Sequence, residues 1–128
     1  MKVYLAGPIF GCTDDEAHTW REVVKEHLGE ANCIDPMRRD YRGIEDANVN
    51  AIVNDDYDDI DASSVVLANC WKPGWGTPME IHYAYTCSKH VIAICPPGPV
   101  SPWLTYHAGI VHSLEEALAW LEREFFHK

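Results

Sequence analysis

The amino-acid sequence predicts an α/β fold: a single doubly wound parallel sheet of about five strands with helices on both faces. Short apolar runs alternate along the chain with stretches of helical periodicity, which is the pattern of repeated strand–helix units. Units of this size favour parallel strands joined by helical crossovers. Because 128 residues, 47% of them apolar, suffice for one core and are short for two, we expect one domain over residues 1–128.

Five apolar runs are predicted as strands. Each is four to six residues long, and most of them stop at or beside Gly, Pro, Asn or Asp, as buried parallel strands commonly do. They are residues 2–7, 31–35, 64–69, 91–95 and 109–112.

Four helices are predicted between and after these strands. A capping box at residues 13–16 opens the first, and the second spans roughly residues 46–62. The third is predicted to begin with Thr77 as its N-cap and a proline at its first position, which puts Glu80 three residues after the cap. Residues 113–116 open the last helix with the same capping pattern.

The composition narrows the class of protein. A net charge of −10 argues against binding to a nucleic-acid backbone, but it does not exclude a small nucleoside or nucleotide as ligand. No apolar run approaches the ~18 residues of a membrane span, and the apolar N-terminal run is too short for a secretory signal, so we expect a cytoplasmic protein without membrane partners. The cysteines and histidines lack the spacing of metal ligands, and we expect neither metal nor cofactor.

The predicted loops indicate where a ligand would bind. In flavodoxin- or Rossmann-like sheets, ligands lie at the carboxyl ends of the strands, near the reversal in strand order. Three predicted strand-end loops have unusual residues: 7–11, 35–43 and 70–76. We expect them to form the walls of one pocket.

Asp56 is the first candidate for chemistry, because it falls inside the apolar stripe of the second predicted helix. A carboxylate on an apolar face is costly unless it has a partner or a function. Local pairing among the many acids of this helix is the alternative. The stripe consists of Val49, Ile52, Val53, Tyr57 and Ile60.

Glu80 has two interpretations. As the third residue after the cap it would complete a capping box, which by itself explains a glutamate there. Alternatively, the helix dipole keeps a first-turn carboxylate ionised at the pocket, where Glu80 acts as a nucleophile and Asp56 as a proton donor. Most enzymes that cleave glycosidic bonds use two carboxyl groups in different environments as their catalytic residues. Cys70 is a weaker candidate nucleophile, since the sequence places no basic partner beside it.

The segments "VYLAGPI" and "SSVVLANCWKPGWGTPMEIHYA", with Asp56 set 24 residues before Glu80, resemble the nucleoside 2-deoxyribosyltransferase family and the related 2′-deoxynucleoside 5′-monophosphate N-glycosidases. The resemblance extends from Val3 to about Ser101. It implies that Glu80 attacks the anomeric carbon of a deoxyribose, that Asp56 assists departure of the base, and that Tyr4 helps to place the glutamate and the sugar. It also implies that Ser101 reaches into a neighbouring subunit's site, and hence a homodimer at least.

The chain departs from the family pattern where the 5′ end of a substrate would lie. The family's transferases have an aspartate six residues before the nucleophile and its monophosphate hydrolases a serine, whereas this chain has Gly74. In the first loop, Pro8 and Phe10 replace a serine and an arginine of the hydrolases. Guanidinium groups bind phosphate well, so the arginines of loop 35–43 are candidates for binding a 5′-phosphate in place of the missing residues. The alternative is that they form a solvated basic loop without a ligand. These arginines are Arg38, Arg39 and Arg42.

The sequence therefore predicts an enzyme, hydrolase or transferase, that acts on the N-glycosidic bond of a (2′-deoxy)nucleoside or nucleoside 5′-monophosphate through a covalent glycosyl-glutamate. The rival hypothesis is a non-catalytic nucleotide-binding or signalling module, which would not need Asp56 on an apolar face. Aromatic residues in the predicted loops, such as Trp71 and Trp75, favour stacking on a base. The residues predicted to bind substrate are Gly7, Pro8, Ile9, Phe10, Arg38, Arg39, Arg42, Gly74, Gly76, Met79, Ser101 and Trp103.

Overall fold

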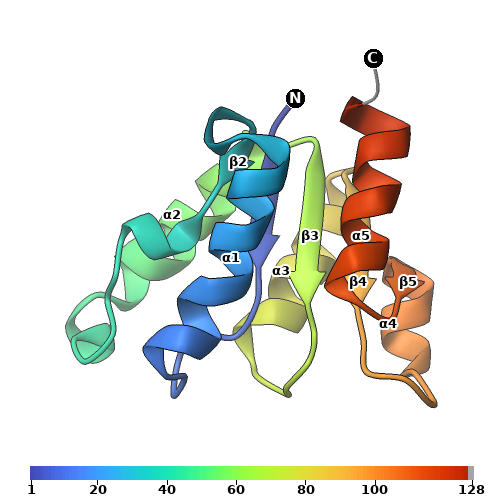
Figure 1. The fold of residues 1–128 in the computed structure, drawn as a ribbon. Helices are drawn as coiled ribbons and strands as arrows, with labels where there is room; N and C mark the ends of the chain where they lie inside the picture. Colours follow the sequence, from blue (N-terminus) through green and yellow to red (C-terminus); the bar gives the residue numbers. More distant parts are fainter. Residues whose placement is uncertain (127–128) are drawn as a thin grey trace.

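A computed structural model describes residues 1–126 and contains one five-stranded sheet with the strand order β2-β1-β3-β4-β5 (Figure 1). All neighbouring strands run parallel. The predicted fold class, an α/β protein with a doubly wound parallel sheet, is confirmed. The strands are β1 (Val3–Ala6), β2 (Cys33–Ile34), β3 (Val65–Asn69), β4 (His90–Ile94) and β5 (Gly109–Val111).

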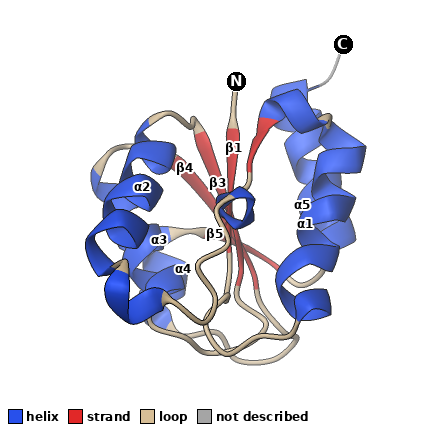
Figure 2. Ribbon diagram, turned by 90° about the vertical axis from the view of Figure 1, so that its left-hand side faces the viewer, coloured by secondary structure: helices blue, strands red, loops and turns tan. Residues whose placement is uncertain are grey.

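Helices cover both faces of the sheet (Figure 2). On one face lie α1 (Asp14–Leu28) and α5 (Leu114–Leu121), which continues into a π-helical segment, Glu122–Phe126. On the other lie α2 (Val49–Asp61), α3 (Gly76–Thr86) and the short α4 (Pro102–His107). Three short 3-10 helices occupy the connections: Glu30–Asn32, Pro36–Arg38 and Glu45–Ala47.

The period-two alternation of β1 divides its side chains between two apolar cores. Val3 and Leu5 pack into the core that α1 and α5 cover. Tyr4 and Ala6 point to the opposite face and pack with residues of α2 and α3. This register decides the position of the candidate site, because it places the Tyr4 side chain beneath α2 and α3.

The start of α3 differs from the prediction. The helix begins at Gly76, and Thr77 is buried inside its first turn instead of capping it. No side chain caps this helix, and the carboxylate of Glu80 is hydrogen-bonded to the Tyr4 hydroxyl. The capping-box interpretation of Glu80 is therefore wrong, because its side chain points to the sheet and not back to the cap.

Helix α4, which contains Trp103, was not among the predicted helices. Ser101 caps this helix by accepting a hydrogen bond from the backbone N–H of Trp103 at 3.2 Å, and Pro102 occupies the first helical position. A serine followed by proline is a recognised helix start, and this local signal was available in the sequence.

The crevice for a ligand forms where the chain leaves β1 and β3. These strands are neighbours, yet β1 leads to α1 on one face and β3 leads to α3 on the other. The two loops therefore diverge and leave a space at the carboxyl ends of the strands. Gly7, directly after β1, allows α1 to approach, because a Cβ at this position would lie 2.8 Å from Cζ2 of Trp20.

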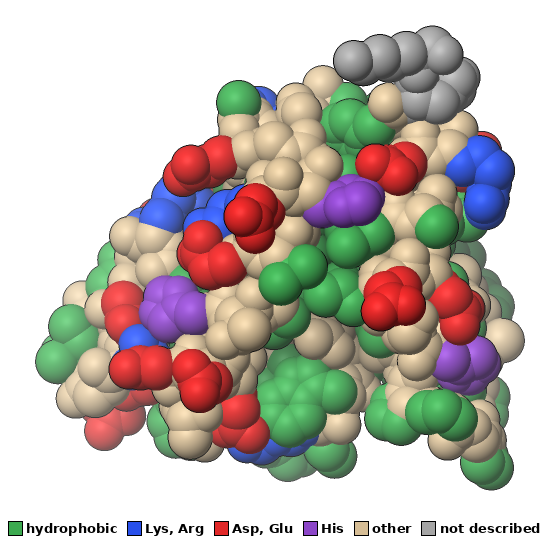
Figure 3. All heavy atoms as spheres, in the orientation of Figure 1, with side chains coloured by type: hydrophobic (Ala, Val, Ile, Leu, Met, Phe, Trp, Pro, Cys, Tyr) green, Lys and Arg blue, Asp and Glu red, His purple; other side chains and the backbone are tan. Residues whose placement is uncertain are grey.

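The surface reflects the acidic composition. Acidic side chains are spread over the face that α1 and α5 form, with fewer basic ones among them (Figure 3). Within residues 1–126, no helix combines the length and the apolar character that crossing a bilayer requires.

Candidate functional site

A cavity of about 580 Å³ opens at the carboxyl ends of β1 and β3. Its walls are the loop after β1, the segment between β2 and α2, helix α2 itself, and the β3–α3 loop with the beginning of α3. The volume is typical of a small-molecule site. The predicted site residues on these walls are Gly7, Pro8, Ile9, Phe10, Arg39, Arg42, Asp56, Gly74, Gly76, Met79 and Glu80.

Tyr4 connects the sheet to Glu80. Its side chain is completely buried, and its hydroxyl donates a hydrogen bond to Oε2 of Glu80, 76 positions along the chain. Burial raises the pKa of Tyr4 far above its ordinary value, and the negative charge of Glu80 acts in the same direction. The phenol therefore remains protonated and fixes one oxygen of a carboxyl group on the cavity wall.

Glu80 and Asp56 form a coupled pair of carboxyl groups. Burial raises the pKa of Glu80 to about 8 and the charge of Asp56 adds to the rise, while the Tyr4 hydrogen bond and Arg21 oppose it. Burial likewise raises the pKa of Asp56 to about 6. Near neutral pH the pair therefore holds about one proton, which the two groups share.

The position of Glu80 in α3 explains why its pKa rises. As the fifth residue of the helix, Glu80 lies past the free N–H groups of the first turn, so burial and the repulsion of Asp56 outweigh the helix dipole. The expectation that the helix terminus keeps Glu80 ionised is therefore wrong, because its pKa is raised to about 8.

The apolar stripe of α2 is narrower than predicted. Ile60 is completely buried, but Val49 and Val53 are exposed. Asp56 is partly buried at the edge of the stripe, on the cavity wall. Asp59, which was not identified from the sequence, is buried one turn further along.

Asp59 binds two of the three loop arginines. Arg38 donates to both of its carboxylate oxygens, at 2.7 and 3.0 Å, and Nη2 of Arg39 donates to Oδ2 at 2.6 Å. Burial acts against the charge, but the hydrogen bonds from Arg38 and Arg39 lower the pKa of Asp59. Arg39 also contacts Asp55 and Asp56 and lines the cavity, whereas Arg38 is not among the cavity residues.

Arg42 lies on the cavity wall between two acids. Its Nη2 is 2.6 Å from Oδ2 of Asp40, and its Nη1 is 2.7 Å from Oδ1 of Asp14. The hydrogen bonds that Arg42 donates to Asp40 and Asp14 raise the pKa of Arg42. Each of the three arginines thus forms ion pairs with carboxylates of the protein. The loop is therefore neither a basic patch without partners nor a set of arginines that contact only solvent.

Two large aromatic side chains stand at the cavity from opposite loops. Phe10, after β1, is 80% exposed, and Trp75, before α3, is 87% exposed. Exposing two such rings is unfavourable in water, and their flat faces suit stacking on a planar ring system. Nearby, Gly74 leaves the wall open, since a Cβ there would have no atom within 4 Å.

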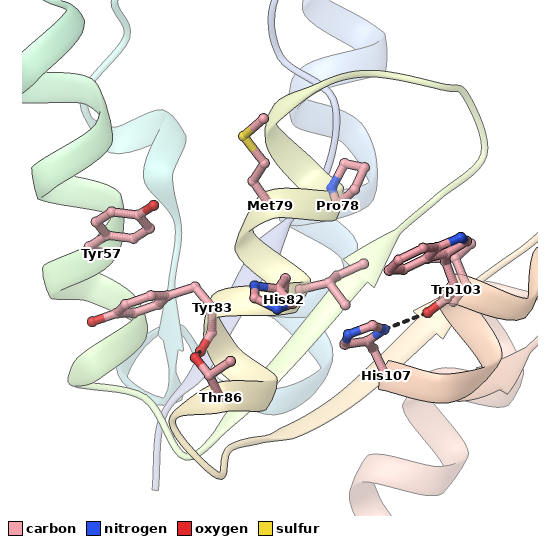
Figure 4. A pocket seen from close by; sticks show the side chains of 10 residues that line it. Tyr57, Pro78, Met79, His82, Tyr83, Thr86, Trp103 and His107 are labelled. Atoms are coloured by element: carbon pink, nitrogen blue, oxygen red, sulfur yellow. Dashed lines mark hydrogen bonds between the residues drawn. The ribbon is translucent and has the colours of Figure 1, made fainter.

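A second cavity, of about 550 Å³, lies between α2, α3 and α4 (Figure 4). Trp103 and His107 of α4 face His82 of α3 across it, and Trp103 is 77% exposed. Tyr57 and Met79 line both cavities. Trp103 therefore belongs to a groove beside the candidate site and not to its wall, and Ser101 is exposed at the start of α4.

Arg21 was not identified from the sequence, yet it supports the floor of the candidate site. It is completely buried and donates to the backbone carbonyl oxygens of Leu5, Ala17 and Gly7 at 3.2, 2.6 and 3.1 Å. Burial lowers the pKa of Arg21, and nearby Asp35 opposes the change. Its helical spacing with Ala17 gave no hint of this role, because an arginine in an amphipathic helix is normally exposed.

No cluster of three or more His, Cys, Asp or Glu residues suited to holding a metal ion occurs within residues 1–126. The chemically active groups that the cavity brings together are the two carboxyl groups, the Tyr4 hydroxyl and the guanidinium groups beside them.

Comparisons with solved structures agree with this architecture. The chain is similar to a 2-deoxyribosyltransferase of Bacillus psychrosaccharolyticus, with a TM-score of 0.71 and 15% identity over 92% of this chain and 90% of that one. It is also similar to a 2-deoxyribosyltransferase of Leishmania mexicana, with a TM-score of 0.66 and 20% identity over 97% and 98% of the two chains. It is also similar to a CMP N-glycosidase of Clostridium botulinum, with a TM-score of 0.60 and 20% identity over 95% of this chain and 99% of that one. At these identities the similarity establishes the fold.

The family is established by sequence. No curated protein matches the chain, but the model of the family described as nucleoside 2-deoxyribosyltransferase matches residues 3–101. That segment runs from the start of β1 to the cap of α4 and contains the cavity with its two carboxyl groups. The chain therefore belongs to the nucleoside 2-deoxyribosyltransferase family.

Proposed function

We propose that this protein cleaves the N-glycosidic bond of a (2′-deoxy)nucleoside or nucleoside 5′-monophosphate through a covalent glycosyl-glutamate on Glu80. The observation that carries the proposal is the arrangement around this residue: its carboxyl group lies on the wall of a nucleoside-sized cavity, Tyr4 holds one oxygen, and Asp56 lies close enough to shift its pKa. Membership of a glycosyl-transferring family supports the same chemistry.

In the first step, an oxygen of ionised Glu80 forms a bond to C1′ while the bond from C1′ to the base nitrogen breaks. The bonding electrons go to the base, and protonated Asp56 supplies the proton that neutralises it. In the second step, water or another base attacks C1′ from the opposite side, and the Asp56 carboxylate takes the proton that the attacking molecule loses. The bond from C1′ to Glu80 breaks and its electrons return to the Glu80 carboxylate, so the configuration is retained overall. Water gives hydrolysis and a base gives transfer.

The productive state requires the single proton of the pair to be on Asp56 and the charge to be on Glu80. The higher pKa of Glu80, about 8 against about 6 for Asp56, puts that proton mainly on Glu80. Substrate binding must therefore move the proton from Glu80 to Asp56. The leaving base favours this position of the proton, because the base accepts a hydrogen bond and then the proton from Asp56. A bell-shaped dependence of kcat/KM on pH is expected, since both fully protonated and fully ionised pairs are inactive.

Phe10 and Trp75 are proposed to enclose the base. They project from two different loops of the cavity and are largely exposed, which supports a planar ligand between or against them. The sugar would lie toward Tyr4 and Glu80, and its 5′ group toward Gly74 and the uncapped first turn of α3, whose free N–H groups suit a hydroxyl or phosphate oxygen.

We further propose a homodimer or larger homo-oligomer in which α4 borders a neighbour's site. The apolar groove that Trp103 lines is continuous with the candidate site through Tyr57 and Met79. Burying exposed aromatic side chains of this kind is a common source of association energy. We also treat residues 1–128 as one domain, because Val3 near one end and Leu121 near the other share an apolar core.

The proposal is tested by incubating the purified protein with a panel of nucleosides and 5′-monophosphates, with and without a free base, and separating the products by chromatography. We expect base release or exchange with the native protein and none with Glu80→Ala or Glu80→Gln. Rapid quenching and intact-mass spectrometry should detect the added glycosyl group on the native protein only. A folded Glu80→Ala protein with near-native turnover would refute the covalent mechanism, and binding without turnover by the native protein would support a non-catalytic module.

A further inference from the structure

We propose that Arg39 is a positioning residue for Asp56: Asp59 fixes its guanidinium group, and that group holds the Asp56 carboxyl at the cavity wall. This inference rests on the proposed function, in which Asp56 gives its proton to the leaving base. In this proposal Arg39 contacts carboxylates of the protein and not the phosphate of a substrate, which was the role considered from the sequence.

The contacts of Arg39 define its position. Nη2 lies 2.6 Å from Oδ2 of Asp59 and 3.5 Å from Oδ1 of Asp56, and Nε lies 3.4 Å from Oδ2 of Asp55. A guanidinium group is planar and presents its N–H groups in a fixed fork. The short contact with Asp59 therefore determines where the guanidinium group lies, and it leaves the same Nη2 within ion-pair distance of Asp56.

Asp59 is itself a rigid anchor. It is buried next to Ile60, a residue of the core between α2 and the sheet. Arg38 binds both of its carboxylate oxygens from the solvent side, where the Arg38 side chain is 47% exposed against 24% for Arg39. Arg38 thus binds Asp59 from the solvent side, whereas Arg39 also contacts Asp56 at the cavity wall.

The spacing of the acids makes this arrangement possible. Asp55, Asp56 and Asp59 occupy neighbouring positions on successive turns of α2, so that a single guanidinium group reaches all three. Three carboxylates this close repel one another, and Arg39 supplies the compensating charge. Its removal would leave Asp56 free to turn away from the cavity and would weaken its ionised form.

The charged and titratable groups around Asp56 come from every element packed against it. Asp59 and Asp55 of α2 disfavour its ionised form, whereas Arg39 and Arg21 favour it. Asp56 in turn acts on Glu80 of α3 and Tyr4 of β1, raising the pKa of both. After burial, the largest influence on the Asp56 pKa is Arg39, which lowers it.

This placement suits a proton donor at the moment of transfer. When the O–H bond of Asp56 breaks and the base gains the hydrogen, the bonding electrons stay on Asp56 as a new carboxylate charge. Arg39 already lies beside the carboxyl group that gains the charge, so no group has to reorganise to stabilise it. The geometry also keeps Asp56 aimed at the cavity before the substrate arrives.

The test compares Arg39→Gln, Arg39→Lys and Arg38→Gln in the full-length protein. The Asp56 carboxyl is titrated by ¹³C NMR in protein labelled at aspartate, with Asp56→Asn used to assign its signal. We expect Arg39→Gln to raise the Asp56 pKa by about one unit, and Arg39→Lys, which keeps the charge, to raise it less. Arg38→Gln, which removes a guanidinium group from the same Asp59 anchor, should leave the Asp56 pKa in place.

Kinetics on an unphosphorylated nucleoside gives the second readout. We expect Arg39→Gln to lower kcat at least about tenfold with little change in KM, and to move the acidic limb of the kcat/KM profile to higher pH. In Arg39→Lys, the acidic limb of the kcat/KM profile should lie closer to its native position than kcat lies to its native value. Lysine keeps the positive charge but lacks the planar set of N–H donors of a guanidinium group.

Three results would overturn the proposal. One is an Asp56 titration that is the same in Arg39→Gln and the native protein. Another is an equal effect of Arg38→Gln, which would make the contact a general property of the ion cluster. The third is a rise in KM for a 5′-monophosphate alone, with kcat unchanged, which would make Arg39 a phosphate donor. The NMR titration requires no turnover, so it tests the Arg39 proposal even in a protein without activity. A protein that releases no base from any substrate would refute the proposed function but would not change the titration result.

Discussion

The hydroxyl of Tyr4 donates a hydrogen bond to Oε2 of Glu80, joining the completely buried first strand to the third helix across 76 positions of sequence. The bond fixes one oxygen of Glu80 and leaves its second oxygen available at the cavity wall. It also opposes the rise in the Glu80 pKa that burial and Asp56 cause. A residue of the sheet core thus controls both the direction and the charge of the proposed nucleophile.

Tyr4→Phe is expected to lower the plateau of kcat/KM about tenfold to a hundredfold, because a hydrogen bond to a charged group contributes roughly 1.5–3 kcal/mol. Without the bond, the pKa of Glu80 rises further and its ionised form becomes rarer at neutral pH. The alkaline limb of the pH profile should therefore move to higher pH. Tyr83→Phe is the matched control, since the Tyr83 hydroxyl binds Asp61 at 2.7 Å outside the cavity. Equal losses in both variants would contradict a specific role for Tyr4.

Glu80→Gln is expected to stabilise the protein, increasingly so as pH rises. The folded protein holds the Glu80 proton up to a pKa of about 8, whereas the unfolded chain releases it near the ordinary value of 4.5. Between these values the folded state binds more protons, so native stability falls as pH rises through this window and stays reduced above it. Glutamine does not titrate and avoids the loss, which we expect to reach a few kcal/mol above pH 8.

The measurement for Glu80→Gln is the melting temperature by calorimetry at pH 5, 7 and 9. The advantage of the variant should be smallest at pH 5 and largest at pH 9. Glu45→Gln serves as the control, because Glu45 also lies on the cavity wall but accepts a hydrogen bond from the Gly43 N–H. A difference between native protein and Glu80→Gln that does not change with pH would contradict the assigned titration.

Trp75→Ala is expected to raise KM about tenfold or more while changing kcat less, because stacking on a base contributes roughly 1–3 kcal/mol and acts on binding. Phe10→Ala should behave similarly from the opposite loop. Trp71→Ala is the comparison, since Trp71 is not among the cavity residues and lies against Lys72. If Trp71→Ala impairs binding as strongly as Trp75→Ala, the aromatic residues act through loop stability and not through the base.

Arg42→Ala is expected to raise KM for a nucleoside 5′-monophosphate at least about tenfold and to leave the unphosphorylated nucleoside nearly unaffected. Arg42 is the arginine of the cavity wall that does not contact Asp56, and a phosphate would compete for it with Asp40 and Asp14. Steady-state kinetics on both substrates decides the matter. Equal loss on both would make the loop structural, and no effect on either would make Arg42 a scaffold for Asp40 and Asp14 only.

Trp103→Glu is expected to dissociate the proposed oligomer and to reduce activity, because a charge would enter an apolar interface that borders a neighbour's site. Light scattering and sedimentation at assay concentration measure the assembly. Glu115→Gln, a change on the exposed first turn of α5 on the opposite face of the sheet, controls for surface changes in general. A native protein that is monomeric and fully active would refute the shared-site proposal.

Local sequence patterns determined much of the fold. The strands, the first two helices and the last helix follow from apolar periodicity and from Thr13 and Ser113 as caps, both of which accept the expected backbone hydrogen bond. These signals act over a few residues, so the chain carries them without tertiary context. The sequence alone also singled out Asp56, because a carboxylate among apolar residues is unusual, and Glu80, because an acid in the first turn of a helix would lie at the predicted pocket.

Only the tertiary structure decided what these groups contact. It turned Glu80 from a cap into a partner of Tyr4, and it buried Arg21 against backbone carbonyl groups. It also paired the loop arginines with acids of α2 and of their own loop, in the way that Asp59 binds Arg38 and Arg39. Such pairings join residues that are distant in sequence, and their geometry depends on how strands and helices pack. The charge of each residue is local information, but its partner, burial and pKa are properties of the folded chain.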